Sequence, residues 1–194
     1  KAETPETPAA TEATASETGL PEIVVSDEEL AGNPFRQEWT ADYGVPPFAE
    51  IDDGHYMPAT KKAILELRAD IDAIVDNPDA PTFENTIVAI DVAGGSLNKV
   101  LNVFGNITNT DTNDTLSELE AEIWPMLTRE MNAINFNQDL FERVKTVYSQ
   151  RDRLGLDEQD ARLLELVHRE FVRNGADLSL EVKTEVAAIN EELS

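Results

Sequence analysis

Cysteine is absent from this sequence of 194 residues, and histidine occurs only twice, at His55 and His168. The lack of cysteine excludes a disulfide framework, a thiolate nucleophile and a cysteine-based zinc site. Basic residues are scarce as well, because 39 acidic residues face 15 Lys and Arg and give a net charge of −24. A surface this acidic repels phosphate backbones, so we expect no nucleic-acid partner. No run of 18 apolar residues is present, which argues against a membrane span.

The charge is not evenly spread, because the first 32 residues carry eight acids and a single base, Lys1. Through Thr18 this segment is almost entirely Ala, Thr, Glu, Pro and Ser, a composition that cannot bury enough apolar area to order the chain. We therefore predict an acidic low-complexity tail or spacer over 1–32, with residues 20–25 docking as an extended arm. Since the sequence begins with Lys rather than Met, we also expect that an upstream part was removed.

The tail suits the tether of a lipid-anchored bacterial envelope protein, which predicts a periplasmic or cell-envelope location. A solubilising tail on a cytoplasmic protein has the same composition, so that alternative stays open. The acidic surface fits solubility, and it also fits attraction of a basic peptide or partner.

Residues 33–51 show no helical period and are rich in proline and aromatic residues. Proline fixes φ and removes a backbone donor, so this segment is predicted to form an extended strap laid across helices. We expect four aromatic side chains to be its buried anchors, although such a stripe also suits a peptide-binding surface: Phe35, Trp39, Tyr43 and Phe48.

After the strap, apolar residues recur at steps of three and four through the rest of the chain, as in amphipathic helices. No stretch shows sustained alternation, so the predicted fold is an all-α, irregular array of about seven helices. The apolar stripes cover 63–75, 83–90, 97–107, 116–134, 140–148, 163–171 and 182–193.

Local signals predict where several of these helices begin and end. Asn77-Pro78 ends the first, and Thr82 caps the second, which Gly94-Gly95 stops. Asp114 or Thr115 is expected to cap the long helix, in which Pro125 predicts a kink or a break. Asn174-Gly175 is expected to close the sixth in a left-handed cap.

The last stripe stays apolar up to Leu193 and meets no capping residue. Because a domain rarely ends inside its own helical pattern, we expect the sequence to be truncated from a larger parent protein. The faces that would pack on the missing part should then be exposed around 160–194, and such apolar faces favour self-association of the fragment.

A series of short motifs runs in order through residues 33–194. Its members are Asn33-Pro34-Phe35, Pro46-Pro47-Phe48, His55-Tyr56-x-Pro58, Pro81-Thr82-Phe83-Glu84-Asn85-Thr86-Ile87, Phe104-Gly105-Asn106, Leu156-Asp157, Arg162-Leu163-Leu164, Phe171-Val172-Arg173-Asn174-Gly175-Ala176, Ile189-Asn190 and Leu193-Ser194. In order and spacing they resemble the N-terminal region of the thimet oligopeptidase family of zinc metallopeptidases, in its branch with bacterial dipeptidyl carboxypeptidase and oligopeptidase A. The acidic tail lies outside this resemblance.

The resemblance implies a helical lobe that forms one wall of a deep channel for short peptides. The opposing C-terminal lobe is then the missing partner, and it carries zinc on a His-Glu-x-x-His helix whose Glu activates the attacking water. The parent protein is accordingly expected to be a zinc-dependent hydrolase of short peptides. Whether it cleaves internally or releases dipeptides cannot be decided, because the residues that recognise the substrate's carboxylate belong to the absent half.

The chain itself does not carry that motif. At His168-Arg169-Glu170, Arg169 stands at the motif's Glu position and Val172 stands at its second His position. We therefore assign no catalytic, cofactor-binding or metal residue and expect this region to be inactive alone. His168 is expected to be a helix-surface residue, and His55 is expected to order the strap.

Two weaker cation-site patterns have structural alternatives. Asp111-x-Asn113-x-Thr115 with Glu122 imitates a calcium loop, but Leu116 occupies the position that needs Gly, and helix capping explains the same residues. Asp52-Asp53 beside His55 could also hold a cation, although adjacent solvated acids are common in loops.

Two functions from different classes remain. The chain is either the non-catalytic lobe of a zinc oligopeptidase or a stand-alone acidic helical module for protein interaction. They differ in whether the gene continues into a His-Glu-x-x-His helix.

Overall fold

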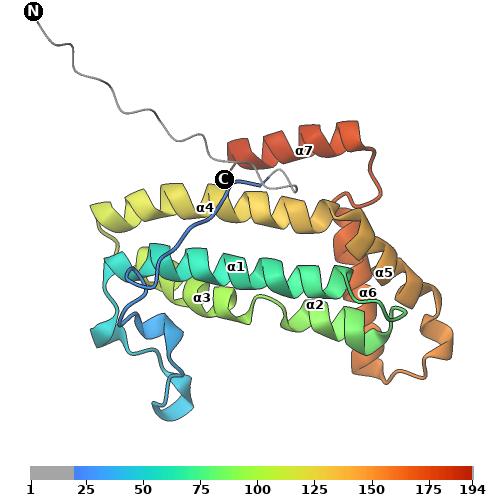
Figure 1. Cartoon of the computed structure of the whole chain (residues 1–194), viewed down its shortest axis with the longest axis horizontal. Coiled ribbons are helices and arrows are strands. Elements are labelled where there is room, and N and C mark those ends of the chain that lie inside the picture. The colour runs from blue at the N-terminus through green and yellow to red at the C-terminus, as the bar shows by residue number, and fades with distance from the viewer. Residues whose placement is uncertain (1–19, 194) are drawn as a thin grey trace, which may run out of the picture.

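The computed structural model describes residues 20–193, and within that range every regular element is a helix or a helical turn (Figure 1). The prediction of an all-α array of about seven helices is confirmed. A π-helical segment, Phe83–Val88, leads directly into the short helix α2. The α-helices are α1 (Tyr56–Val75), α2 (Ala89–Val92), α3 (Gly95–Thr110), α4 (Asp114–Phe136), α5 (Gln138–Ser149), α6 (Glu158–Arg173) and α7 (Leu180–Leu193).

Helices α1, α3 and α4 run side by side and enclose the main core, while α5 and α6 stand at one end of this group (Figure 1). α7 lies along the outer side of α4, away from α1. The core is continuous from α1 to α6, and its fully buried side chains are Ile64, Ile87, Phe104, Ile123, Leu140, Phe141 and Val144.

The turn that joins α1 to the next helical segment follows the predicted local chemistry. α1 ends before Asn77-Pro78, and Thr82 then caps Phe83–Val88 by accepting a hydrogen bond from the Asn85 amide at 3.0 Å. Asn85 Oδ1 accepts in return from the Thr82 amide at 2.8 Å, which completes a capping box. Arg143 of α5 donates to the Asn77 carbonyl at 3.0 Å, so this turn is held by the helical body as well.

The predicted interruption at Gly94-Gly95 is confirmed, because α2 and α3 are separate helices there. Gly94 has φ +71°, a conformation that favours glycine. A Cβ at this position would also lie 3.1 Å from Leu67 Cδ1 of α1, so the glycine allows the backbone at the start of α3 to approach α1 closely.

The cap predicted at the end of α6 is confirmed in detail. Gly175 has φ +91°, the Ala176 amide donates to the Phe171 carbonyl at 2.9 Å, and the Gly175 amide donates to the Val172 carbonyl at 3.2 Å. This pair of bonds is a Schellman motif.

The predicted cap of α4 is wrong. The cap is Asn113, whose Oδ1 accepts from the Leu116 amide at 2.8 Å, rather than Asp114 or Thr115. Of the kink or break predicted at Pro125, the break does not occur, since one helix spans Asp114–Phe136. Ile123 and Leu127, on either side of the proline, are both buried, and this packing holds the helix together despite the missing backbone donor.

The strap differs from its prediction. Residues 34–55 form four short 3₁₀ turns, and the part around 42–50 projects from the helical body instead of crossing it (Figure 1). Phe35 is buried and Trp39 is half-buried beneath the Lys99 ammonium, but Tyr43 is fully exposed and Phe48 is 47% exposed. Tyr43 and Phe48 are therefore not anchors, because the chain has turned away from the helices before it reaches them.

The predicted arm is confirmed at residues 20–25, which are extended and lie against the helices. Ile23 packs on the core and Val25 is half-buried, while Val24 between them is exposed. Leu30, just beyond the arm, is buried. Residues 1–19 of the predicted tail lie outside the described residues.

By length and composition alone, the stretch Phe83–Thr110 could cross a membrane, so the lack of an unbroken run of 18 apolar residues does not by itself exclude a span. In the structure this stretch is interrupted at Gly94, and Ile87, Val100 and Phe104 lie in the core of the helical body.

Candidate functional site

The two histidines lie in different elements, and each has a structural environment of its own. His55 Nδ1 accepts a hydrogen bond from the Asp52 amide at 2.9 Å, and the His55 carbonyl accepts from Asn33 Nδ2 at 2.9 Å. These bonds join the strap to the start of α1. The prediction that His55 orders the strap is therefore confirmed.

His168 is not the plain surface residue that was predicted. Its ring stacks on Tyr148 of α5, with centroids 3.8 Å apart and planes 6° from parallel, and it is only partly exposed. Burial lowers the pKa of this imidazole, and the nearby cations Arg151 and Lys145 act in the same direction against the carboxylate of Asp177. His168 is partly covered because α5 packs against the face of α6 that carries it.

The residues of the calcium-like pattern serve the start of α4. Asn113 caps the helix and its Nδ2 donates to Asp53 Oδ2 at 2.9 Å, so the structure brings together one residue from each of the two weak cation patterns. Across the described part of the chain, no group of three or more His, Asp or Glu side chains is arranged to hold a metal ion.

A groove between α1 and α4 contains the most unusual polar group of the structure. Glu130 of α4 is 2% exposed, and its carboxylate accepts two hydrogen bonds from Arg68 of α1, from Nε at 2.8 Å and from Nη2. This bidentate bond to Glu130 raises the pKa of Arg68 above its ordinary value. A buried carboxylate needs such a partner, because removing an unpaired charge from water is costly.

Sequence reasoning missed this pair, whose members are 62 residues apart. One signal was present, since Glu130 stands three residues after Leu127 and seven after Ile123, on the apolar stripe of its own helix. An acid at such a position requires a buried cation, but the pattern does not reveal which of the 15 basic residues supplies it.

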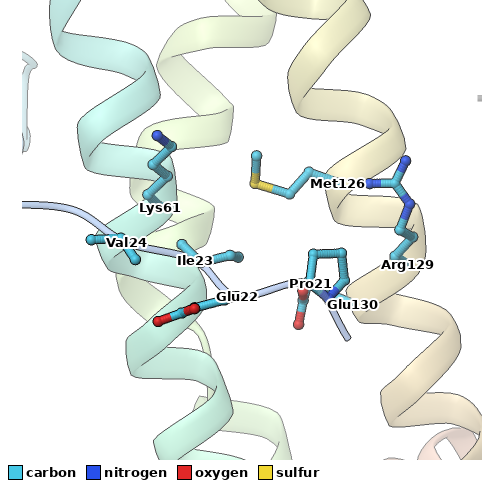
Figure 2. Close-up of a pocket in the computed structure, with 8 residues that line it drawn as sticks. All are labelled: Pro21, Glu22, Ile23, Val24, Lys61, Met126, Arg129 and Glu130. Atoms are coloured by element: carbon cyan, nitrogen blue, oxygen red, sulfur yellow. The ribbon is translucent and has the colours of Figure 1, made fainter. Parts of the chain in front are cut away.

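The arm of residues 20–25 lies across this groove (Figure 2). Figure 2 shows Pro21 beside α4 and Val24 beside α1, with Lys61, Met126 and Arg129 around them. Arg68 Nη2 donates to the Pro21 carbonyl at 3.3 Å, so the guanidinium that neutralises Glu130 also holds the backbone of the arm.

A second candidate surface lies on α7 and the turn before it. The three most exposed large apolar side chains of α7 are Leu180, Ile189 and Leu193. With Val172, Leu178 and Val182 also exposed, the prediction of exposed apolar faces around 160–194 is confirmed for 172–193. An open cavity of about 860 Å³ lies beside this face, lined by Phe136, Gln138, Leu178, Leu180, Lys183, Thr184 and Ala187.

Comparison with known proteins relates most of the chain to peptidases. It is 37% identical to the dipeptidyl carboxypeptidase of Salmonella typhimurium over 163 residues and 39% identical to that of Escherichia coli over 160 residues, or 84% and 82% of this chain. Oligopeptidase A of Haemophilus influenzae is 22% identical over 151 residues. No protein-family model matches the chain.

The matched part is a minor fraction of each relative. The chain spans 24% of the length of the two dipeptidyl carboxypeptidases and 22% of the oligopeptidase A. These two enzymes, dipeptidyl carboxypeptidase and oligopeptidase A, are the relatives that the motif series between residues 33 and 194 indicated. Most of the chain is therefore related to a segment of bacterial dipeptidyl carboxypeptidase and more distantly to one of oligopeptidase A, which is consistent with a fragment of the thimet oligopeptidase family.

Proposed function

We propose that this chain is the N-terminal, non-catalytic helical lobe of a zinc-dependent oligopeptidase or peptidyl-dipeptidase that hydrolyses short peptides. Its role is to form one wall of the channel that admits the substrate. The observation that carries the proposal is the identity of 37–39% to dipeptidyl carboxypeptidases over most of this chain but about a quarter of theirs.

The donor set of this chain does not fit zinc. The sequence has no cysteine and two histidines, of which His55 Nδ1 already accepts the Asp52 amide and His168 stacks on Tyr148. A catalytic zinc site needs three protein ligands around one ion. We therefore assign the metal and the chemistry to the remainder of the protein and derive no catalytic step from these residues.

The apolar face of α7 supports the lobe role. Val182, Ile189 and Leu193 follow one another at steps of seven and four residues, so they share one face of α7, and all three are exposed. Exposed apolar side chains on neighbouring turns favour burial against another surface. In the proposed parent protein, that surface belongs to the catalytic lobe.

The test measures bound zinc and cleavage of short peptides for this chain and for the full-length gene product in parallel. We expect zinc and activity in the full-length protein alone, and loss of activity on chelation. A full-length variant with Gln in place of the motif Glu is the matched control, because it should keep zinc and lose activity.

Other outcomes contradict the proposal in different ways. Stoichiometric zinc and cleavage by this chain alone would mean that its residues form a site. A full-length protein without zinc or activity would favour the alternative, a helical module for protein interaction.

A further inference from the structure

The arm and the groove beneath it have the features of a peptide bound to a receptor. Residues 20–25 are extended, and Ile23 and Val25 turn toward the protein while Val24 is 65% exposed. This alternation is the pattern of a strand that buries every second side chain. The arm reaches Arg68 through a backbone carbonyl, which any extended peptide would offer.

The charge around the arm is also complementary. In a chain with only 15 basic residues, Lys61, Arg68 and Arg129 line the pockets along this groove. Arg68 pairs with Glu130 and Arg129 pairs with Glu191, so the charge offered to a peptide here is mainly that of Lys61. Glu22 is the acidic residue of the arm, and it lies among the residues of the same pocket as Lys61 and Arg129. A peptide that carries an acid directly before β-branched residues, as the arm does with Glu22 before Ile23, therefore suits the groove in both charge and shape.

The groove continues beyond the arm. A cavity of about 550 Å³ follows it between α1 and α4, from Leu20 to the end of α4, and includes apolar Ile71, Ile134 and Phe136. Asp72, Asn137 and the Arg68–Glu130 pair supply polar groups in the same cavity. A floor of apolar side chains with a few fixed polar groups is typical of a ligand site.

We propose that the α1–α4 groove is a binding site for extended acidic peptide segments with β-branched residues at alternate positions, and that residues 20–25 are a tethered occupant which such a segment displaces. The proposal goes beyond the function above, because it concerns recognition by this chain without the catalytic lobe. Because the arm is covalently joined to the protein, it is present at the groove at an effective concentration on the order of millimolar. An incoming peptide therefore binds weakly until the arm is released.

The test uses a fluorescent peptide with the sequence of residues 18–27 and fluorescence anisotropy. Three versions of this chain serve as receptors: the unchanged chain, a chain that lacks residues 1–25, and the chain of 194 residues with Ile23→Asp and Val25→Asp. Circular dichroism checks that both altered chains are folded. We expect binding to both altered chains and at least tenfold weaker binding to the unchanged one. A peptide with the same two aspartates is the control and should not bind.

Charge is tested separately in the chain without the arm. Lys61→Gln should weaken binding of the peptide, and added salt should reduce the difference. Lys62→Gln is the matched control, because Lys62 pairs with Glu66 at 2.5 Å and does not line the groove under the arm. Equal effects of the two substitutions would contradict a site at Lys61.

Folded altered chains that do not bind the peptide would overturn the proposal. So would equal binding to the altered and unchanged chains, or a dimer formed by exchange of arms between two copies. If neither altered chain folds, the unchanged chain is treated with a millimolar photo-crosslinking version of the peptide. Adducts on α1 and α4 would then support the proposal, and adducts elsewhere, or none, would overturn it.

Discussion

The two sides of α4 are stabilised in different ways. Toward α1 and α3, α4 contributes to a core whose side chains are fully removed from solvent, including Ile64, Phe104 and Ile123. Toward α7, the helix makes polar contacts: Asn190 Nδ2 donates to Asn132 Oδ1 at 2.8 Å, and Arg129 pairs with Glu191 at 3.3 Å.

The difference matters because the two kinds of contact contribute unequal free energies. Burial of a large apolar side chain stabilises by roughly 1.5–3 kcal/mol, whereas a typical hydrogen bond contributes about 1 kcal/mol. An exposed ion pair contributes less still. We therefore expect the α1–α3–α4 core to unfold as one unit and α7 to open locally before it.

Replacement of the central core aromatic should have the largest effect. Phe104 is fully buried, with its ring centroid 5.0 Å from that of Tyr56 and 6.2 Å from that of Trp124. Phe104→Ala should lower the free energy of unfolding by about 3–5 kcal/mol in chemical denaturation. The matched substitution Ile189→Ala on α7 should stay within about 0.5 kcal/mol. Similar losses at the two positions would contradict the comparison.

Breaking the ion pair in the groove should have the next largest effect. Glu130→Gln leaves the Arg68 guanidinium without its carboxylate, and the free energy of unfolding should fall by roughly 3 kcal/mol. The double variant Arg68→Met with Glu130→Met removes both charges and should recover much of that loss. If the double variant is as unstable as Glu130→Gln, the cost comes from altered packing and not from the unpaired charge.

The polar attachment of α7 can be broken alone. Asn190→Ala removes the hydrogen bond to Asn132 and should cost about 1 kcal/mol. Because the loss is local, amide hydrogen exchange should become faster in α7 and remain unchanged in α1. Faster exchange in both helices would show that α7 and the core unfold together.

Stability should also depend on the protonation of His168. Its pKa is lowered in the folded state, chiefly by burial, so the unfolded state binds the proton more tightly. Stability is therefore complete above the ordinary histidine pKa near 6.5, falls as the pH drops through it, and levels off below the folded pKa. His168→Phe keeps a ring beside Tyr148, and denaturation between pH 8 and 5 should show a smaller dependence.

The exposed face of α7 should affect association and leave stability unchanged. Ile189→Asp should reduce self-association of the chain in sedimentation velocity, because it places a charge within an exposed apolar face. Its free energy of unfolding should change by no more than about 0.5 kcal/mol. An unchanged chain that stays monomeric at high concentration would contradict this prediction.

Predictions from short-range chemistry succeeded where backbone geometry decides. Pro78 cannot continue α1, Thr82 offers a hydroxyl to an unpaired amide, and Gly175 adopts the left-handed cap. Each effect acts over a few residues, so it is visible in the sequence. The motif series likewise indicated the peptidase relatives, because it depends only on residue order and spacing along the chain.

Predictions that depend on contacts between separate elements were less successful. The aromatic residues Tyr43 and Phe48 suggested anchors, but the turns between them and Trp39 carry them into solvent. Pro125 suggested a break that buried neighbours prevent, and His168 is partly covered by α5. In each case a neighbour from another element decided the outcome.

The sequence alone determined the all-α class, the helix ends set by proline, glycine and capping residues, the acidic surface and the peptidase relationship, because these depend on composition and local spacing. Tertiary structure alone decided that Arg68 meets Glu130 across 62 residues and that the arm lies over them. It also decided that α7 presents Leu180 and Leu193 to solvent. Such pairings depend on how helices pack through space, and helical periodicity shows which face is buried without showing what buries it.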